Sequence, residues 1–392
     1  MKRGRYDGVY IVGAGQTRYE KRTEKPVQRL IWEAIDAGLT SAKLGWKDVN
    51  GLASTSFVLP PDNVTVLAEH FGIEARWLFQ GLYGGASGII GMLHAARAIQ
   101  AGDVDVVACA TADVFDVASH NEMIDRSFNA SLRDYLAPYG FGGANGVFAL
   151  QTRLYMEAYG TTREDFGRLA IAQRENALLN PNALFDKPLT MDDYLNARPI
   201  AEPLRLFDCV HPCCGGDCVI LCNEETVNRL DVPAVEILGG GEFHNYPADD
   251  IYSLSAGWES FRERMFDQAN CSPADMHFVQ LYDDYPVMEF IQLEGLGFCA
   301  KGEATDLIRS RDTTVKGDLP INTGGGQLSA GQAGASGGMI GVVEAVLQLR
   351  QEAGARQIDN CTRGVVSGYG MVSYGRGLSC SAAVLARRNG RA

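Results

Sequence analysis

The stretch with the clearest chemical potential is glycine-rich and runs from Asn322 to Glu344. It holds eight glycines and leads into an apolar pattern with helical spacing at Met339, Val342 and Val346. This sequence predicts a tight turn that leads into the N-terminus of a buried helix. Backbone N–H groups that are unpaired at such a turn would bind a negatively charged group.

A second set of chemically capable residues is a cluster of thiols and one imidazole: Cys209, His211, Cys213, Cys214, Cys218 and Cys222. These residue types bind zinc, but the Cys-x-x-Cys spacing of a zinc knuckle is missing. The segment also reads as an apolar strand. We therefore expect buried, reduced thiols and no metal site.

A third candidate is Gly13-Ala14-Gly15, which follows a short β-rich run and superficially resembles a dinucleotide-binding turn. The third glycine of that motif is absent, and no acidic residue ends a second strand about 20 positions later. The sequence therefore does not predict a dinucleotide site.

The elements that must position these residues occur twice. Gly85-Ala86-Ser87-Gly88 opens an apolar helix, as Gly334-Ala335-Ser336-Gly337 does, and the β-rich run 11–15 recurs as 237–241. A fixed order of repeated pieces indicates a duplicated unit. We predict two halves, each built as strand, helix, strand, helix, strand.

The duplicated pattern is interrupted between about Ser119 and Arg205. This stretch is rich in polar residues, aromatics and helix breakers, and it has no counterpart in the second half. An insertion of this size is usually a lid or a substrate-binding excursion. We predict an N-terminal half over residues 1–118, a loop domain over 119–205, the end of the N-terminal half over 206–230, and a C-terminal half over 231–392.

Composition narrows the functional classes. The chain has 392 residues, of which 46% are hydrophobic and 21% charged, as in an ordinary α/β protein with large cores. A formal net charge of −13 argues against a nucleic-acid partner. We expect no membrane segment because no apolar run is long enough, and a cytoplasmic protein whose ten cysteines are reduced.

Together these features resemble the thiolase superfamily, specifically its sterol-carrier-protein or lipid-transfer branch. The resemblance covers essentially the whole chain and is carried by the two Gly-Ala-Ser-Gly helix starts, Asn322 to Gly326, Tyr155 to Gly160 and Arg174 to Pro181. It implies an α/β thiolase fold, in which duplicated βαβαβ halves form a five-layer αβαβα sandwich with an inserted loop domain. It further implies a homodimer and an acyl-CoA substrate, with coenzyme A present only as part of that substrate.

The catalytic positions of a thiolase are altered in this chain. The position of the nucleophilic cysteine corresponds to Gly85, and the histidine that activates this cysteine corresponds to Gln332. A second histidine corresponds to Tyr282, and the C-terminal reactive turn falls at Met371 to Tyr374, which lacks cysteine. Glycine cannot be acylated and glutamine cannot act as a base. The groups for thiolase chemistry are therefore missing.

A second reaction of the same site needs no nucleophile. Cleavage of the Cα–Cβ bond of a β-hydroxyacyl-CoA requires a base for the hydroxyl, donors for the thioester enolate and an acid for the departing carbon. The aldolases of steroid side-chain degradation resemble this chain, because they have tyrosine in place of the histidines and no nucleophilic cysteine. The predicted function is a carbon–carbon lyase, a retro-aldolase, acting on a bulky, for example steroid-like, β-hydroxyacyl-CoA.

The catalytic residues implied by this resemblance are Tyr282, Asp283, Tyr285, Gln332 and Tyr374. A second tyrosine is expected where Gln332 stands, so the second proton carrier stays open among Tyr285, Tyr369 and Tyr374. Asp283 and Asp284 either act as a pair of catalytic carboxyl groups or have a structural role in a turn. The residues expected to bind substrate are Gly85, Ser87, Gly325, Gly326 and Gly331, and Gly85 is expected to make room for a bulky substrate.

Two other functions remain open. One is a thiolase or acyl-CoA acyltransferase with an atypical active site, and the other is a non-catalytic acyl-CoA or lipid-binding subunit. The resemblance also implies a small zinc-ribbon and OB-fold partner that holds the acyl-CoA. Product identity separates lyase from thiolase, since a lyase releases a ketone or aldehyde without consuming free CoA.

Overall fold

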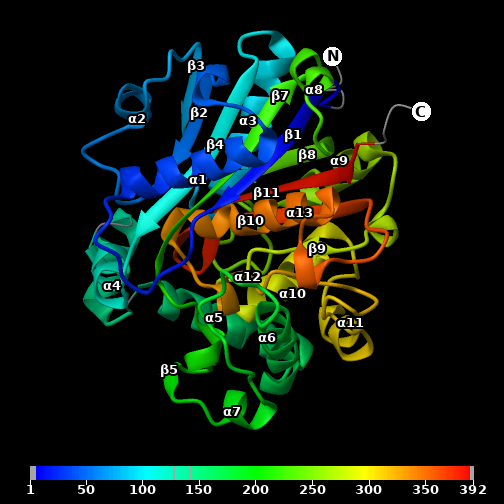
Figure 1. The fold of residues 1–392 in the computed structure, drawn as a ribbon. Helices are drawn as coiled ribbons and strands as arrows, with labels where there is room; N and C mark the ends of the chain where they lie inside the picture. Colours follow the sequence, from blue (N-terminus) through cyan, green and yellow to red (C-terminus); the bar gives the residue numbers. More distant parts are fainter. Residues whose placement is uncertain (1–5, 127–128, 142, 389–392) are drawn as a thin grey trace.

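A nine-stranded mixed sheet is the framework of the protein (Figure 1). The computed structural model describes residues 6–126, 129–141 and 143–388. The strand order is β3-β2-β4-β7-β1-β8-β11-β10-β9. Strands β1 and β8 join the two halves of the sheet through two residue pairs, Tyr10 with Glu236 and Ile11 with Val235.

The N-terminal half contributes five strands and the helices between them. Its elements are β1 (Val9–Gln16), α1 (Val27–Ala42), β2 (Gly51–Thr55), α2 (Val64–Phe71), β3 (Trp77–Gln80), α3 (Ser87–Ala101), β4 (Val106–Val114), β7 (Cys214–Asn223) and α8 (Glu224–Arg229). The expected thiol-rich strand begins only at Cys214, because residues Leu206–Asp208 form a short helical turn.

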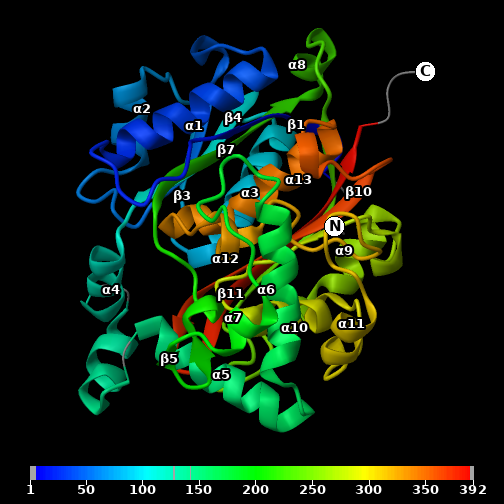
Figure 2. The same ribbon diagram turned by 60° about the horizontal axis from the view of Figure 1, so that its bottom comes forward.

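The C-terminal half repeats the plan. Its elements are β8 (Val235–His244), α9 (Arg262–Ala269), β9 (Val279–Gln280), α10 (Pro286–Leu296), α11 (Ala304–Ser310), α12 (Gly326–Ala330), α13 (Ile340–Arg350), β10 (Arg363–Ser373) and β11 (Arg376–Arg387). The chain between the halves forms α4 (Val117–Arg126), α5 (Gly143–Tyr159), α6 (Arg163–Ala177), α7 (Met191–Leu195), β5 (Pro199–Ala201) and β6 (Leu204–Arg205). Figure 2 shows α5, α6 and α7 grouped beside α10, α11 and α12 of the C-terminal half.

Five layers follow from the contacts of the helices. Helix α1 packs on strands of the N-terminal half, and α9 packs on β8 and β11. Helices α3 and α13 contact strands of both halves and so form the central layer. The cores between these layers are filled by aliphatic residues such as Ile35, Ile89 and Val346. The predicted thiolase-type sandwich is confirmed.

The glycines of Gly13-Ala14-Gly15 serve helix packing in this fold. A Cβ atom at Gly15 would lie 2.2 Å from the carbonyl oxygen of Ala34, and one at Gly13 would lie 2.3 Å from that of Gly38. Only glycine allows α1 to approach β1 so closely. This explains the motif without a dinucleotide.

The two Gly-Ala-Ser-Gly helix starts meet at the centre of the molecule. A Cβ atom at Gly88 would lie 2.4 Å from the carbonyl oxygen of Gly338, and one at Gly338 would lie 2.4 Å from that of Gly85. The side chain of Ser336 also donates to the carbonyl of Thr111 on β4 at 2.7 Å. The duplication therefore brings the start of α3, the turn before α13 and the end of β4 to one place.

Candidate active site

Tyr282 lies directly over Gly85 at this meeting point. A Cβ atom on Gly85 would lie 1.9 Å from Cε2 and 2.2 Å from Cζ of the Tyr282 ring. The phenol ring therefore fills the space into which any side chain at position 85 would project. Gly85 is expected to make room for a bulky substrate; in this structure the Tyr282 ring occupies the space beside it, and the role of Gly85 in binding stays a prediction.

Helix α10 holds the Tyr282 segment in place. The backbone N–H of Tyr282 donates to Oε1 of Gln292 at 3.0 Å, and Nε2 of Gln292 donates to the carbonyl of Tyr282 at 2.6 Å. The same nitrogen donates to the carbonyl of Met288 at 2.9 Å. Because both the oxygen and the nitrogen of the buried Gln292 amide are hydrogen-bonded, this amide fixes the backbone of Tyr282 and so orients its ring.

Tyr282 lines a small inner cavity of about 60 Å³. Six of its lining residues carry polar side chains that can hydrogen-bond or transfer protons: His120, Tyr282, Asp284, Tyr285, Gln332 and Tyr369. Gly85, Phe148 and Met371 are among the residues that form its remaining walls. The cavity thus combines Tyr282, Tyr285 and Gln332, three of the five predicted catalytic residues.

The Tyr282 phenol is held in its neutral form. Burial raises its pKa well above the usual value, and the nearby carboxyl groups of Asp284 and Asp283 raise it further. A hydrogen bond from the Gln332 side chain acts in the opposite direction and lowers this pKa. The result is a protonated phenol in an enclosed site, which suits a proton donor.

The other tyrosines of the cavity are engaged by the protein. The hydroxyl of Tyr285 donates to Oδ1 of Asn145 at 2.7 Å, and its ring stacks on Phe148 with centroids 4.1 Å apart. The hydroxyl of Tyr369 accepts hydrogen bonds from the backbone N–H of Gly377 and from Gln151. Tyr374 is not among the described residues that line the cavity, since it sits in the turn between β10 and β11.

The two adjacent carboxyl groups differ in their surroundings. Asp283 accepts from the backbone N–H groups of Gln327 and Leu328, at 2.9 and 3.2 Å, and is not among the described lining residues of the cavity. It caps α12. Asp284 does line the cavity, is 7% exposed, and has an Oδ1 atom without a hydrogen-bond partner in the described structure.

Four predicted substrate-binding residues lie outside the described cavity wall. The hydroxyl of Ser87 accepts from the backbone N–H of Tyr83 at 2.9 Å. Gly325, Gly326 and Gly331 have φ angles of 99°, 57° and 118°, a region that favours glycine. They shape the turns around α12, and their role in binding stays a prediction.

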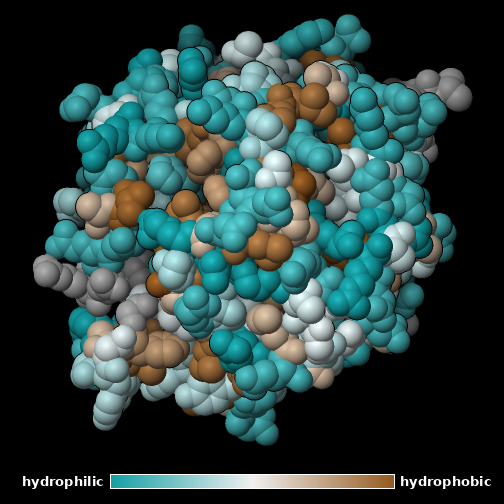
Figure 3. Space-filling view, turned by 90° about the horizontal axis from the view of Figure 1, so that it is seen from below, coloured by the Kyte–Doolittle hydropathy of each residue, from teal (hydrophilic) through white to brown (hydrophobic). Residues whose placement is uncertain are grey.

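A larger cavity of about 680 Å³ adjoins the inner one and is called the vestibule here. The two share His120, Ala144, Val210 and Tyr285 as lining residues. Arg174, Arg198 and His211 line the vestibule, and the guanidinium of Arg174 lies 4.4 Å from the ring centroid of Phe185. The face of the molecule seen from below in Figure 3 carries apolar patches of limited size among polar residues.

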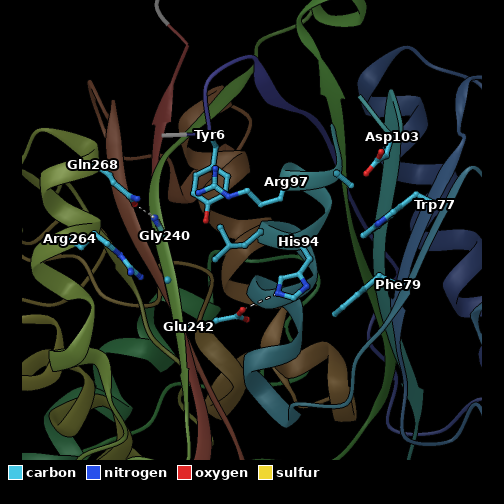
Figure 4. A pocket seen from close by; sticks show the side chains of 13 residues that line it. Tyr6, Trp77, Phe79, His94, Arg97, Asp103, Gly240, Glu242, Arg264 and Gln268 are labelled. Atoms are coloured by element: carbon cyan, nitrogen blue, oxygen red, sulfur yellow. Dashed lines mark hydrogen bonds and ion pairs between the residues drawn. The ribbon is translucent and has the colours of Figure 1, made fainter. Parts of the chain in front are cut away.

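A separate cleft of about 610 Å³ lies between α3, β3, β8 and α9 (Figure 4). Its described lining shares no residue with the inner cavity. His94 Nε2 lies 2.9 Å from Oε1 of Glu242 there, and the guanidinium of Arg97 lies 3.8 Å from the ring centroid of Tyr6.

The thiols of the candidate metal cluster are buried on or beside β7. Cys213, Cys214, Cys218 and Cys222 are fully or almost fully buried free thiols. Within the described ranges, no group of three or more metal-binding side chains is arranged to hold an ion. Nor does any described helix combine the length and apolar character needed to cross a membrane.

Comparison with known proteins agrees with this geometry. Residues 248–383 match the family model of the thiolase C-terminal domain. The chain is 32% identical to a steroid side-chain-cleaving aldolase of Thermomonospora curvata, over 87% of this chain and 90% of the relative. It is 33% identical to the 17-hydroxy-3-oxo-4-pregnene-20-carboxyl-CoA lyase of Mycobacterium tuberculosis, over 87% and 91%. A solved Ltp2-ChsH2(DUF35) aldolase superposes with a TM-score of 0.85 at 30% identity, covering 97% of this chain and 98% of that one.

The chain therefore belongs to the thiolase superfamily. Within the superfamily it falls in the sterol-carrier-protein and lipid-transfer-like branch, together with the steroid side-chain aldolases. The predicted family and the prediction of a thiolase-fold acyl-CoA lyase are both confirmed.

Proposed function

We propose that the protein cleaves the Cα–Cβ bond of a bulky β-hydroxyacyl-CoA by a retro-aldol reaction. The observation that carries this proposal is the Tyr282 ring over Gly85. A proton donor there takes the place of the nucleophile that acyl transfer requires. The relatives named above, which are steroid side-chain lyases, support a steroid-like acyl group.

The site supplies groups for the developing charge. We infer that the Tyr282 phenol is the donor for the α-carbon and that the Gln332 amide, which lines the same cavity, donates to the thioester oxygen as the enolate forms. Coenzyme A enters as part of the substrate. Arg174, Arg198 and His211 of the vestibule favour its phosphates, and the wall that the vestibule shares with the inner cavity favours entry of the thioester arm from that side.

Assembly forms a second part of the proposal. Strand β3 ends the strand order of the sheet, and the rings of Trp77 and Phe79 stack there at 6.0 Å beside the cleft of Figure 4. A strand edge with partly buried aromatics favours pairing with a second copy, hence a homodimer. The solved aldolase complex that this chain resembles supports a small second subunit, which we infer to be of the zinc-ribbon and OB-fold type. Ten free thiols favour a cytoplasmic location.

Product analysis tests the proposal. A panel of β-hydroxyacyl-CoA thioesters is incubated with the full-length protein, with and without free CoA, and products are identified by mass spectrometry. We expect a ketone or aldehyde and a shortened acyl-CoA in equal amounts, whether or not free CoA is present. Two thioester products that require free CoA would overturn the proposal in favour of an atypical thiolase.

A further inference from the structure

Retro-aldol cleavage requires a proton acceptor at the β-hydroxyl group as well as a donor at the α-carbon. Tyr282 is a neutral phenol and serves as the donor. Gln332 has no basic group, although it stands where thiolases have a histidine. The proposed function therefore leaves the base unassigned, and the inference below rests on that function.

The engaged tyrosines of the cavity are poor bases. Burial raises the pKa of Tyr285 well above its usual value and also raises that of Tyr369, so both are protonated. Their hydroxyls already bond to Asn145, and to Gly377 and Gln151, respectively. Tyr285 uses its proton in the bond to Asn145, and Tyr369 accepts two hydrogen bonds, so neither phenol is ionised and neither offers a basic phenolate oxygen.

His120 is the second candidate, and its position argues against it. Burial lowers its pKa to about 4, so the imidazole is neutral and able to accept a proton. However, it lies on α4 and lines both the vestibule and the inner cavity, so it stands at the boundary between them. Its ring packs edge-on against Phe115, with centroids 5.4 Å apart. It is better placed to line the entrance than to reach the reacting carbons.

Asp284 has the features that the others lack. It lines the inner cavity and is not among the described lining residues of the vestibule, it is 7% exposed, and its Oδ1 atom has no hydrogen-bond partner in the described structure. It lines the inner cavity together with Tyr282, Tyr285 and Tyr369. A buried carboxylate oxygen without a partner is costly unless a ligand supplies a donor. The β-hydroxyl of the substrate is such a donor.

We propose that Asp284 is the general base of the reaction and a catalytic residue in contact with the substrate hydroxyl. Oδ1 takes the hydroxyl proton, and the O–H electron pair forms the carbonyl double bond as the Cα–Cβ bond breaks. The electrons of that bond form the thioester enolate, whose α-carbon takes the proton of Tyr282. Transfer of the proton from Asp284 to the Tyr282 phenolate then restores both groups, and no oxidant or reductant is consumed.

The pH dependence follows from the groups around Asp284. The titratable groups that interact electrostatically with Asp284 or share its cavity are Tyr282, Asp283 and Tyr285 in its own segment, and His120, Cys209 and Tyr369 on other elements. Neither lysine nor arginine occurs among the described lining residues of the inner cavity. Burial, and then the Asp283 carboxyl, raise the pKa of Asp284 well above its usual value. Asp284 accepts a proton only when it is ionised, and because its pKa is raised, it ionises at a higher pH than an ordinary carboxyl group. We therefore expect kcat/KM to rise with pH.

The test is Asp284→Asn in the full-length protein, with any obligatory second subunit present. Asparagine keeps the volume but removes the base, so kcat should fall by about 10²- to 10⁴-fold. Binding of an unreactive acyl-CoA should stay unchanged, and any residual activity should lose its rise with pH. Asp284→Glu should retain part of the activity and the pH dependence, because it keeps a carboxylate.

Matched variants keep the test decisive. Asp192→Asn, at an exposed position on α7, should leave the activity unchanged, and His120→Gln should change KM more than kcat. Wild-type activity in Asp284→Asn, or loss of the pH dependence in His120→Gln, would overturn the assignment. If Asp284→Asn proves unstable, a wild-type kcat/KM that is flat between about pH 5 and 8 would overturn it instead. Failure of the proposed function is distinct, since the wild-type protein itself would then cleave no substrate.

Discussion

Replacement of Gly85 by alanine tests the geometry on which the active site rests. The added methyl group would lie 1.9, 2.2 and 2.5 Å from three carbons of the Tyr282 ring. Unstrained carbon contacts are about 3.5–4.0 Å, so the ring must retreat by about 1.5 Å or more. Because α10 clamps the Tyr282 backbone through Gln292, the ring cannot move freely.

Two effects of this substitution can be given a size. Overpacking of a buried site costs about 1–3 kcal/mol of the free energy of unfolding. Displacement of a catalytic group by about 1 Å costs about 10²-fold in kcat. Gly91→Ala, in the same helix α3, is the control, because its nearest neighbours would be 3.8 Å away. It should be neutral or stabilising by about 0.5–1 kcal/mol.

A double-mutant cycle assigns the effect to the Tyr282 ring. Urea denaturation and turnover are measured for Gly85→Ala, Tyr282→Ala and the combination of both. We expect the stability penalty of Gly85→Ala to vanish when Tyr282 is alanine, which corresponds to a coupling of about 1–3 kcal/mol. An equal penalty in both backgrounds, or full activity of Gly85→Ala, would refute the proposed contact.

Three further predictions concern chemistry and stability. Tyr282→Phe should lower turnover by about 10²- to 10⁴-fold with an unchanged melting temperature, as measured by product formation and calorimetry; an active variant would remove Tyr282 from the mechanism. Arg356→Met should lower the free energy of unfolding, measured by urea denaturation, by about 3–5 kcal/mol. In the wild type the Glu344 carboxylate lies 2.9 Å from Nε of Arg356, and the substitution leaves this carboxylate buried without its ion pair. Burial raises the pKa of Asp217 to about 7, so its contribution to stability is present below about pH 4 and is lost as pH rises to about 7. Asp217→Asn should therefore reduce the fall in the denaturation midpoint between these pH values, and an unaltered fall would contradict this.

Local sequence signals were sufficient to predict the framework but not the whole site. The repeated Gly-Ala-Ser-Gly segments predicted the duplication, because a glycine-bounded turn before an apolar helix is encoded within a few residues. Helix α10 was not predicted, since it is buried on every side and so lacks an amphipathic period. The loop domain was predicted as an insertion, but the contribution of Asn145 and Phe148 to the Tyr285 environment depends on tertiary packing.

The predicted catalytic residues were likewise identified only in part. Correspondence with a thiolase motif identified Tyr282 and Gln332, which do lie in one cavity. It could not separate Asp283 from Asp284, because adjacent residues of one turn share the same sequence environment. Only the structure shows that the Asp283 carboxylate caps α12 while Asp284 lines the cavity. Likewise, the contact of Gly85 with Tyr282 joins residues far apart in the chain.

Cleavage in deuterium oxide is the most direct measurement of the central claim, that this site breaks a carbon–carbon bond by proton transfer without a covalent acyl-enzyme. The full-length protein, with any required second subunit, is incubated with a β-hydroxyacyl-CoA in D₂O without free CoA, and the thioester product is analysed by mass spectrometry. We predict one deuterium at the α-carbon of the shortened acyl-CoA, released together with an unlabelled carbonyl compound. Formation of products only after free CoA is added, with both fragments recovered as thioesters, would contradict the account.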